Sequence, residues 1–220
     1  MNLLHSTKPI LRRKQRDIYC QEYQSLVSLY LKIAGKTLYS GLYSCLDQVF
    51  IIWGLIVAAI FVTAQFLPIS WTTQAIVWSI LTLAGTLSMM ILTHFWVKQQ
   101  QLNWILYLWV MLMVSGVILT DCSIFLGWGW LLIHLSHLWL GLCSLGYIIT
   151  ALGLSSRALL LVGLGHLLGI FSLPYVMGWE FLATAGIMVV SLLVLAETQW
   201  DHSLSLIHIT EPTRPIAISY

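Results

Sequence analysis

The chain has 220 residues, of which 59% are hydrophobic and 8% charged, and its mean hydropathy is +0.89. A soluble domain carries about 25% charged residues, so this composition excludes a soluble globular protein and indicates a polytopic membrane protein. The formal net charge of +2 is too small for a nucleic-acid-binding surface, and the four cysteines lack the CxxC spacing of a zinc site.

The first 47 residues form the most basic part of the chain, and we expect them to be cytoplasmic. Residues 1–16 are polar and basic and predict a surface tail that can touch anionic headgroups. In residues 17–33, large apolar side chains recur at helical spacing, at Tyr19, Tyr23, Leu26, Tyr30 and Ile33. This spacing predicts an amphipathic helix on the cytoplasmic membrane surface, and it fits a helix packed under a bundle equally well.

The rest of the chain divides into apolar runs of membrane-spanning length. A bilayer core of about 30 Å needs roughly 20 apolar residues per helix. Six runs qualify, at residues 48–66, 72–97, 104–120, 124–152, 158–173 and 181–196. The fourth is long enough to be tilted or kinked, and the fifth is short. We therefore expect an all-α integral membrane protein, a bundle of about six transmembrane helices preceded by the amphipathic surface helix.

The basic residues predict the orientation of this bundle. Seven lysines and arginines precede the first run, Lys98 lies between the second and third, and Arg157 lies between the fourth and fifth. With six spans all of these residues fall on one side of the membrane, and the loops on the other side contain none. The positive-inside rule then places both termini in the cytoplasm.

The last residues differ from the rest in origin. Residues 204–214, LSLIHITEPTR, resemble the translation of a transposase-type sequencing adapter. We therefore expect residues 204–220 to be a non-native tail and the natural sequence to end or diverge soon after Asp201. This tail is excluded from the reasoning on fold and site.

Three histidines lie inside the predicted spans, where an ionisable side chain marks a candidate functional site. His134 and His137 belong to the fourth run and share a helix face because they are three residues apart. His166 belongs to the fifth run. Counted from the outer ends of these runs, His134 lies about 15 Å deep and His166 about 12 Å deep, so we expect them at matching depth. Gly163, Gly165 and Gly169 beside His166 predict close helix approach.

These histidines allow three interpretations. They can be neutral groups that hydrogen-bond to Ser136, Thr150 or backbone carbonyls and hold helices together. They can bind a cofactor, namely haem b held by His166 with either His134 or His137. A metal-dependent hydrolase would need three ligands and a carboxylate, and no acid reaches the histidine layer. Asp121 and Glu180 fall at predicted span ends, where we expect them to cap helices.

No nucleophile elbow, phosphate loop, zinc motif or carboxylate pair is found, so we assign no catalytic or metal-binding residue. The sequence favours a non-enzymatic integral membrane protein that acts as an assembly or interaction component. Its expected partners are the lipid bilayer and other membrane protein subunits, and no nucleic acid. One alternative is a haem-binding, redox-accessory membrane protein, and another is a small transporter with three spans in each half.

Overall fold

The computed structural model describes residues 9–13, 27–33 and 36–201. The expected non-native tail, residues 204–220, lies outside the described residues, as does the part of the expected surface helix in residues 17–26. Among the described residues, six helices are long and apolar enough to cross a membrane, which confirms the predicted bundle. They are α2 (Cys45–Phe66), α3 (Trp71–Gln99), α4 (Asn103–Phe125), α6 (Leu135–Leu154), α7 (Arg157–Ser172) and α8 (Glu180–Glu197).

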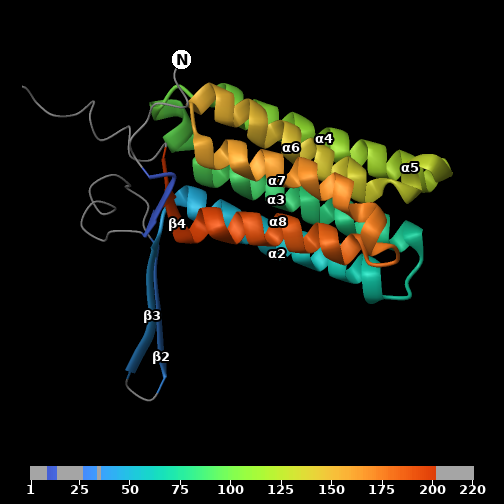
Figure 1. The fold of residues 1–220 in the computed structure, drawn as a ribbon, viewed down its shortest axis with the longest axis horizontal. Coiled ribbons are helices and arrows are strands. Elements are labelled where there is room, and N and C mark those ends of the chain that lie inside the picture. Colours follow the sequence, from blue (N-terminus) through green and yellow to red (C-terminus); the bar gives the residue numbers. More distant parts are fainter. Residues whose placement is uncertain (1–8, 14–26, 34–35, 202–220) are drawn as a thin grey trace, which may run out of the picture.

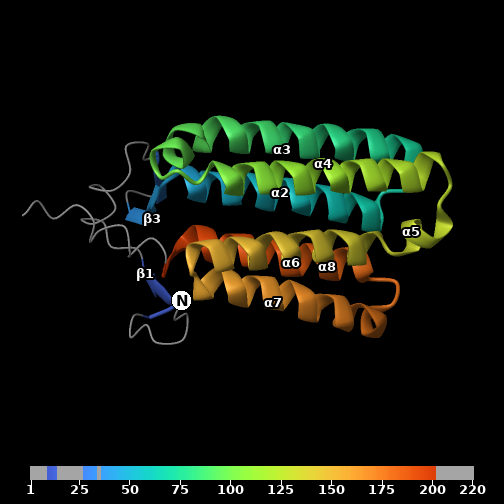
Figure 2. The ribbon, with the colours of Figure 1, turned by 90° about the horizontal axis from the view of Figure 1, so that it is seen from above.

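The six helices form two layers of three. One layer contains α2, α3 and α4, and the other contains α6, α7 and α8 (Figure 2). The outer helices of the two layers pack against each other, α2 on α8 and α4 on α6. The middle helices, α3 and α7, lie on opposite sides of the bundle, at its two outer edges in Figure 2. The first and last spans are therefore neighbours, and the six helices close into a ring.

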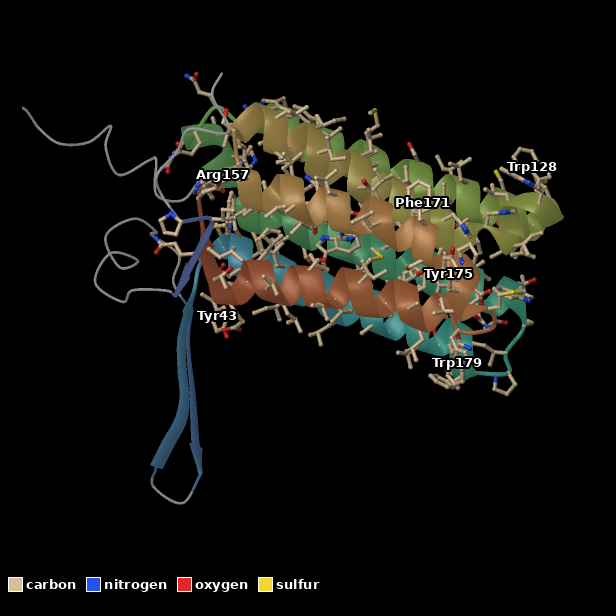
Figure 3. All side chains as sticks on the ribbon, in the orientation of Figure 1. Tyr43, Trp128, Arg157, Phe171, Tyr175 and Trp179 are labelled. Carbon is tan, nitrogen blue, oxygen red and sulfur yellow. The ribbon has the colours of Figure 1, made fainter. Side chains whose placement is uncertain are left out.

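Both ends of the described chain and a hairpin lie at one end of this bundle, the hairpin end. Strand β1 (Leu11–Arg13) pairs there with β4 (Thr198–Trp200), and β2 (Val27–Ile33) pairs with β3 (Lys36–Tyr43). The β2–β3 hairpin projects well away from the helices (Figure 1). At the opposite or far end, the side chains of Trp128, Tyr175 and Trp179 surround the helix ends, whereas Tyr43 and Arg157 mark the hairpin end (Figure 3).

Strand β2 corrects the expected amphipathic helix over residues 27–33. The sequence here is VSLYLKI, in which Val27, Leu29, Leu31 and Ile33 alternate with Ser28, Tyr30 and Lys32. Strict alternation with a period of two is typical of a strand, whereas the helix prediction rested on the wider spacing of Tyr19, Tyr23, Leu26, Tyr30 and Ile33. The strand pairs with β3 in antiparallel register, with an irregularity between Leu31 and Lys32.

The predicted span boundaries agree with the helices to within a few residues, except at the end of the third run and in the fourth run. Helix α2 begins three residues early because Ser44 and Asp47 form a capping box, in which each side chain accepts a hydrogen bond from the other residue's backbone N–H. Helix α4 continues past Thr120 to Phe125, so Asp121 lies inside it. Asp121 therefore does not cap the next helix as predicted. Its carboxylate instead accepts from the hydroxyl of Ser79 on α3, at 2.9 and 3.0 Å.

Charged residues at the hairpin end hold the start of α7 to Asp201, which follows β4. The Asp201 carboxylate accepts from the Ser156 hydroxyl and from the Arg157 backbone N–H, both at 2.7 Å. It also pairs with Arg157 Nε at 3.3 Å. An acid suits a helix N-terminus, so Asp201 offsets the unfavourable position of Arg157 in the first turn of α7. Nearby, the Tyr43 hydroxyl donates to Glu197 at 2.6 Å.

Candidate functional site

His134 lies at an interruption between two helices and not inside a span. The predicted fourth span is in fact two helices, the single-turn α5 (Gly129–Ile133) and α6, and His134 joins them. Gly127, with φ at +66°, lets the chain turn before α5, a conformation that other residues rarely adopt. The His134 Nδ1 atom is 2.7 Å from the Trp130 carbonyl oxygen. This interruption between α5 and α6 lies at the far end of the bundle.

His137 follows one turn later, on the first turn of α6. Its ring centroid is 5.0 Å from that of His134, so the two share a face as predicted. Its Nδ1 atom is buried and has no hydrogen-bond partner in the described part of the chain. Glu180 is the first residue of α8. Glu180 makes no side-chain capping hydrogen bond, so its expected contribution to α8 is limited to its charge near the helix N-terminus.

His166 lies in the middle of α7 and is the most deeply buried of the three histidines, with 1% of its surface exposed. Its Nδ1 atom is 2.8 Å from the Val162 carbonyl oxygen, one turn back on the same helix. Its ring packs on Tyr147 of α6, with centroids 5.2 Å apart. Because a carbonyl can only accept, Nδ1 carries the proton of the neutral ring and Nε2 is left as an acceptor.

The predicted matching depth of His134 and His166 is wrong, and the break at His134 is the reason. His166 contacts Tyr147, which is 13 residues beyond His134 along the chain and ten beyond His137. At 1.5 Å per residue these separations are about 19 and 15 Å along α6. Two imidazoles that ligate one haem iron must meet at a single point. His166 therefore cannot share a haem with His134 or His137, and the residues do not fit the haem of the alternative interpretation.

A cavity of about 150 Å³ lies at the centre of the ring of helices. All six spans contribute to its wall, and the wall is almost entirely apolar and rich in aromatic rings. Drug-sized ligands occupy pockets of about 300–1,000 Å³, so this cavity is too small for a haem and suits a single ring. The polar residues in its wall are Thr82, Thr93, Cys143, Tyr147, Thr150 and His166.

Two ring contacts position the polar residues of the cavity. Trp109 of α4 packs edge-on against Tyr147, with centroids 5.0 Å apart, and Tyr147 in turn packs against His166. Gly163 lets α7 approach α6 closely at this level, and the Ser144 hydroxyl on α6 donates to the Gly163 carbonyl at 2.8 Å. The predicted close approach at Gly163 is thus present. Sequence reasoning identified His166 here but missed Tyr147 and Trp109.

Hydrogen bonds from tryptophan to threonine join neighbouring helices around the ring. In each, an indole N–H donates to a threonine hydroxyl at 3.2 Å: Trp78 to Thr63, Trp109 to Thr150, and Trp139 to Thr120. The first joins α3 to α2, and the other two join α4 and α6 in both directions. Such bonds between polar side chains are a principal means of holding helices together in a membrane.

A repeated spacing in the sequence could have revealed some of these contacts. Four of the spans or their edges contain tryptophan, leucine and glycine in the pattern WxxLxxxG, at Trp78 to Gly85, Trp109 to Gly116, Trp139 to Gly146 and Trp179 to Gly186. In α4 and α6, the tryptophan of each helix packs on the glycine of the other. Threonine follows four residues after both of these glycines and accepts the indole hydrogen bond.

Comparison with known proteins adds no family to these observations. No protein-family model, no curated protein and no solved structure matches the chain. The candidate site therefore rests on its own geometry: a small apolar cavity enclosed by the six helices, with Tyr147 and His166 in its wall.

Proposed function

We propose that the protein is a non-enzymatic integral membrane protein that acts as an assembly component and binds partner subunits through the β2–β3 hairpin. The observation that carries this proposal is the hairpin itself. It extends from the start of α2 away from the bundle (Figure 1), and among the described strands β2 and β3 pair only with each other. Each strand therefore has one edge whose backbone groups pair with no other described strand.

An isolated two-stranded hairpin is marginally stable in water, and open strand edges are templates for pairing with another chain. A strand from a partner that adds to β2 or β3 would satisfy these backbone groups, as in other cases of recognition by strand addition. The length of the strands favours this role, because seven residues of β2 and eight of β3 provide a long edge. Partner binding would thus stabilise the hairpin and join two subunits in one step.

The distribution of basic residues supports a cytoplasmic position for the hairpin. Lys98 is in the last turn of α3 and Arg157 begins α7, and both lie at the hairpin end together with Lys32 and Lys36 in the strands. The loops at the far end contain no lysine or arginine. By the positive-inside rule, the hairpin end and its partner would be on the cytoplasmic side.

The small-transporter alternative lacks comparable support. Carriers of this kind use helices broken near the middle of the membrane. The two breaks in the described bundle, between α5 and α6 and between α7 and the 3₁₀ turn η1 (Leu173–Val176), both lie at the far end. Breaks in that position are ordinary helix ends, so they do not favour transport.

The experiment that tests assembly compares three forms of the protein extracted from native membranes in a mild detergent. These are the full chain, a chain that ends after Asp201, and a hairpin variant in which a glycine–serine segment of equal length replaces residues 27–42. The replacement leaves Tyr43 and the capping box of Ser44 and Asp47 intact. Native electrophoresis and mass photometry give the mass of each particle, to be compared with the 24.9 kDa of one chain.

We expect the full chain and the chain ending at Asp201 to migrate as the same complex, larger than one protomer. The hairpin variant should migrate as a protomer with nearly unchanged thermal stability, because no contact between helices has been removed. A full chain that is already a protomer, or a hairpin variant that keeps the complex, would refute the proposal.

A further inference from the structure

The central cavity contains two hydrogen-bonding atoms that the described residues leave unused. His166 uses Nδ1 in its bond to Val162, and its Nε2 atom makes no hydrogen bond with any described residue. The Tyr147 hydroxyl likewise has no hydrogen-bond partner among the described residues. Both side chains line the cavity and are almost fully buried, at 1% and 5% exposure. In a membrane interior, water cannot readily take the place of a missing partner.

The chemistry of the two atoms restricts what could bind them. Nε2 of the neutral imidazole can only accept a hydrogen bond, because Nδ1 holds the proton, and the tyrosine hydroxyl can both donate and accept. A bound molecule that satisfies Nε2 must therefore bring a donor of its own. A hydroxyl group on the ligand meets this requirement and can also use the tyrosine. A carbonyl or an ether cannot donate to Nε2.

The shape and lining of the cavity restrict the rest of the molecule. A volume of about 150 Å³ with apolar walls is the size that holds a benzene-like ring. Aromatic side chains from several helices line it, including Trp53, Trp109 and Trp139. Aromatic walls favour edge-to-face and offset-stacked contacts with another ring. Together these features describe an aromatic ring that carries a hydroxyl group.

We propose that the central cavity binds a small hydroxylated aromatic ring, of the phenol or quinol class, whose hydroxyl donates to His166 Nε2 and whose oxygen accepts from Tyr147. This inference goes beyond assembly through the hairpin and does not depend on it. The ligand would lie between the two layers of helices (Figure 2).

Binding can be measured by ¹⁹F NMR on the full chain in detergent, with 4-fluorophenol as the probe and fluorobenzene as its match without a hydroxyl. Empty micelles give the partition of each compound into detergent. The first variant, Cys143→Phe, places a ring in the cavity. Its control, Cys122→Phe, makes the same change on α4 at a position outside the cavity wall. The second variant, Tyr147→Phe, removes one hydroxyl and leaves the ring.

We expect a protein-bound 4-fluorophenol signal that persists in Cys122→Phe and disappears in Cys143→Phe. Affinity for 4-fluorophenol should exceed that for fluorobenzene by about tenfold, and Tyr147→Phe should reduce this preference roughly threefold or more, the effect of one net hydrogen bond. If Cys143→Phe does not fold, the change in preference in Tyr147→Phe decides. Absence of a bound signal, equal affinity for the two probes, or an unchanged preference in Tyr147→Phe would overturn the proposal.

Discussion

Replacing Gly163 by alanine tests whether the close approach of α7 to α6 stabilises the bundle. A Cβ atom at this position would lie 2.7 Å from Ile148 Cγ1 and 3.2 Å from both the Ile148 backbone nitrogen and the Ser144 carbonyl oxygen. Two of these three contacts are with backbone atoms, which cannot move away without separating the helices. A Cβ atom at Gly165, two residues later on the same helix, would meet nothing within 4 Å, so Gly165→Ala is a matched control.

The difference between the two variants isolates the steric effect. Alanine favours the helix over glycine by up to about 1 kcal/mol at either position, so this contribution cancels when the variants are compared. Overpacking a close contact costs about 1–3 kcal/mol. We therefore expect Gly163→Ala to be less stable than Gly165→Ala by about 1–3 kcal/mol, and Gly165→Ala to be at least as stable as the parent.

The stability of each variant can be measured by unfolding in mixed micelles with a rising fraction of SDS. The free thiols of Cys45 and Cys143 are buried, so their reaction with a fluorogenic dye reports unfolding in a background where Cys20 and Cys122 are serine. Adding Ile148→Ala to Gly163→Ala removes the closest clashing atom, and the double variant should be more stable than the sum of the single effects by about 0.5 kcal/mol or more. Equal stability of Gly163→Ala and Gly165→Ala would show that the helices do not meet as described.

Three further predictions concern polar contacts. Ser79→Ala should destabilise the bundle by about 1–2 kcal/mol in the same SDS assay, because Asp121 loses its hydroxyl partner inside the membrane, and unchanged stability would contradict that contact. Asp201→Ala should lower the free energy of unfolding by about 1.5–3 kcal/mol and speed amide hydrogen exchange in β4. Asp201→Asn keeps an acceptor for Ser156, so its free energy of unfolding should fall by less. Protein expressed with haem supplied should have a featureless visible spectrum, oxidised and reduced, and a band that disappears in His166→Ala would contradict the separation of the histidines.

The number and position of the spans could be predicted from the sequence because both follow from local composition. About 20 apolar residues must be hydrogen-bonded internally to cross a membrane, so each run becomes a helix whatever its neighbours are. The errors arose where local rules competed. Residues 27–33 satisfy both a helical spacing of tyrosines and a strict alternation, and the strand prevailed. In the fourth run, the length indicated a tilt or a kink, but composition could not place the interruption at His134, because the residues on both sides are equally apolar.

The site was harder to predict because it depends on which helices are neighbours. His166 was identified because an imidazole is conspicuous in an apolar run, whereas Tyr147 and Trp109 resemble any aromatic residues that fill a membrane interior. Of the three glycines near His166, Gly163 and Gly169 would place a Cβ against a side chain of another helix, and Gly165 would not. Whether a glycine allows close approach depends on which face of the helix it occupies. The glycine residues alone do not show which face packs against a neighbouring helix.

The WxxLxxxG pattern shows how pairing itself can be encoded. Tryptophan and glycine seven residues apart lie two turns apart on one face of a helix. When two such helices run antiparallel with the tryptophan of one opposite the glycine of the other, the second tryptophan necessarily meets the second glycine. Helices α4 and α6 do this, with Trp109 on Gly146 and Trp139 on Gly116. The same register places each indole N–H at the threonine one turn beyond the glycine, so in this pair of helices one spacing accounts for both ring contacts and both hydrogen bonds.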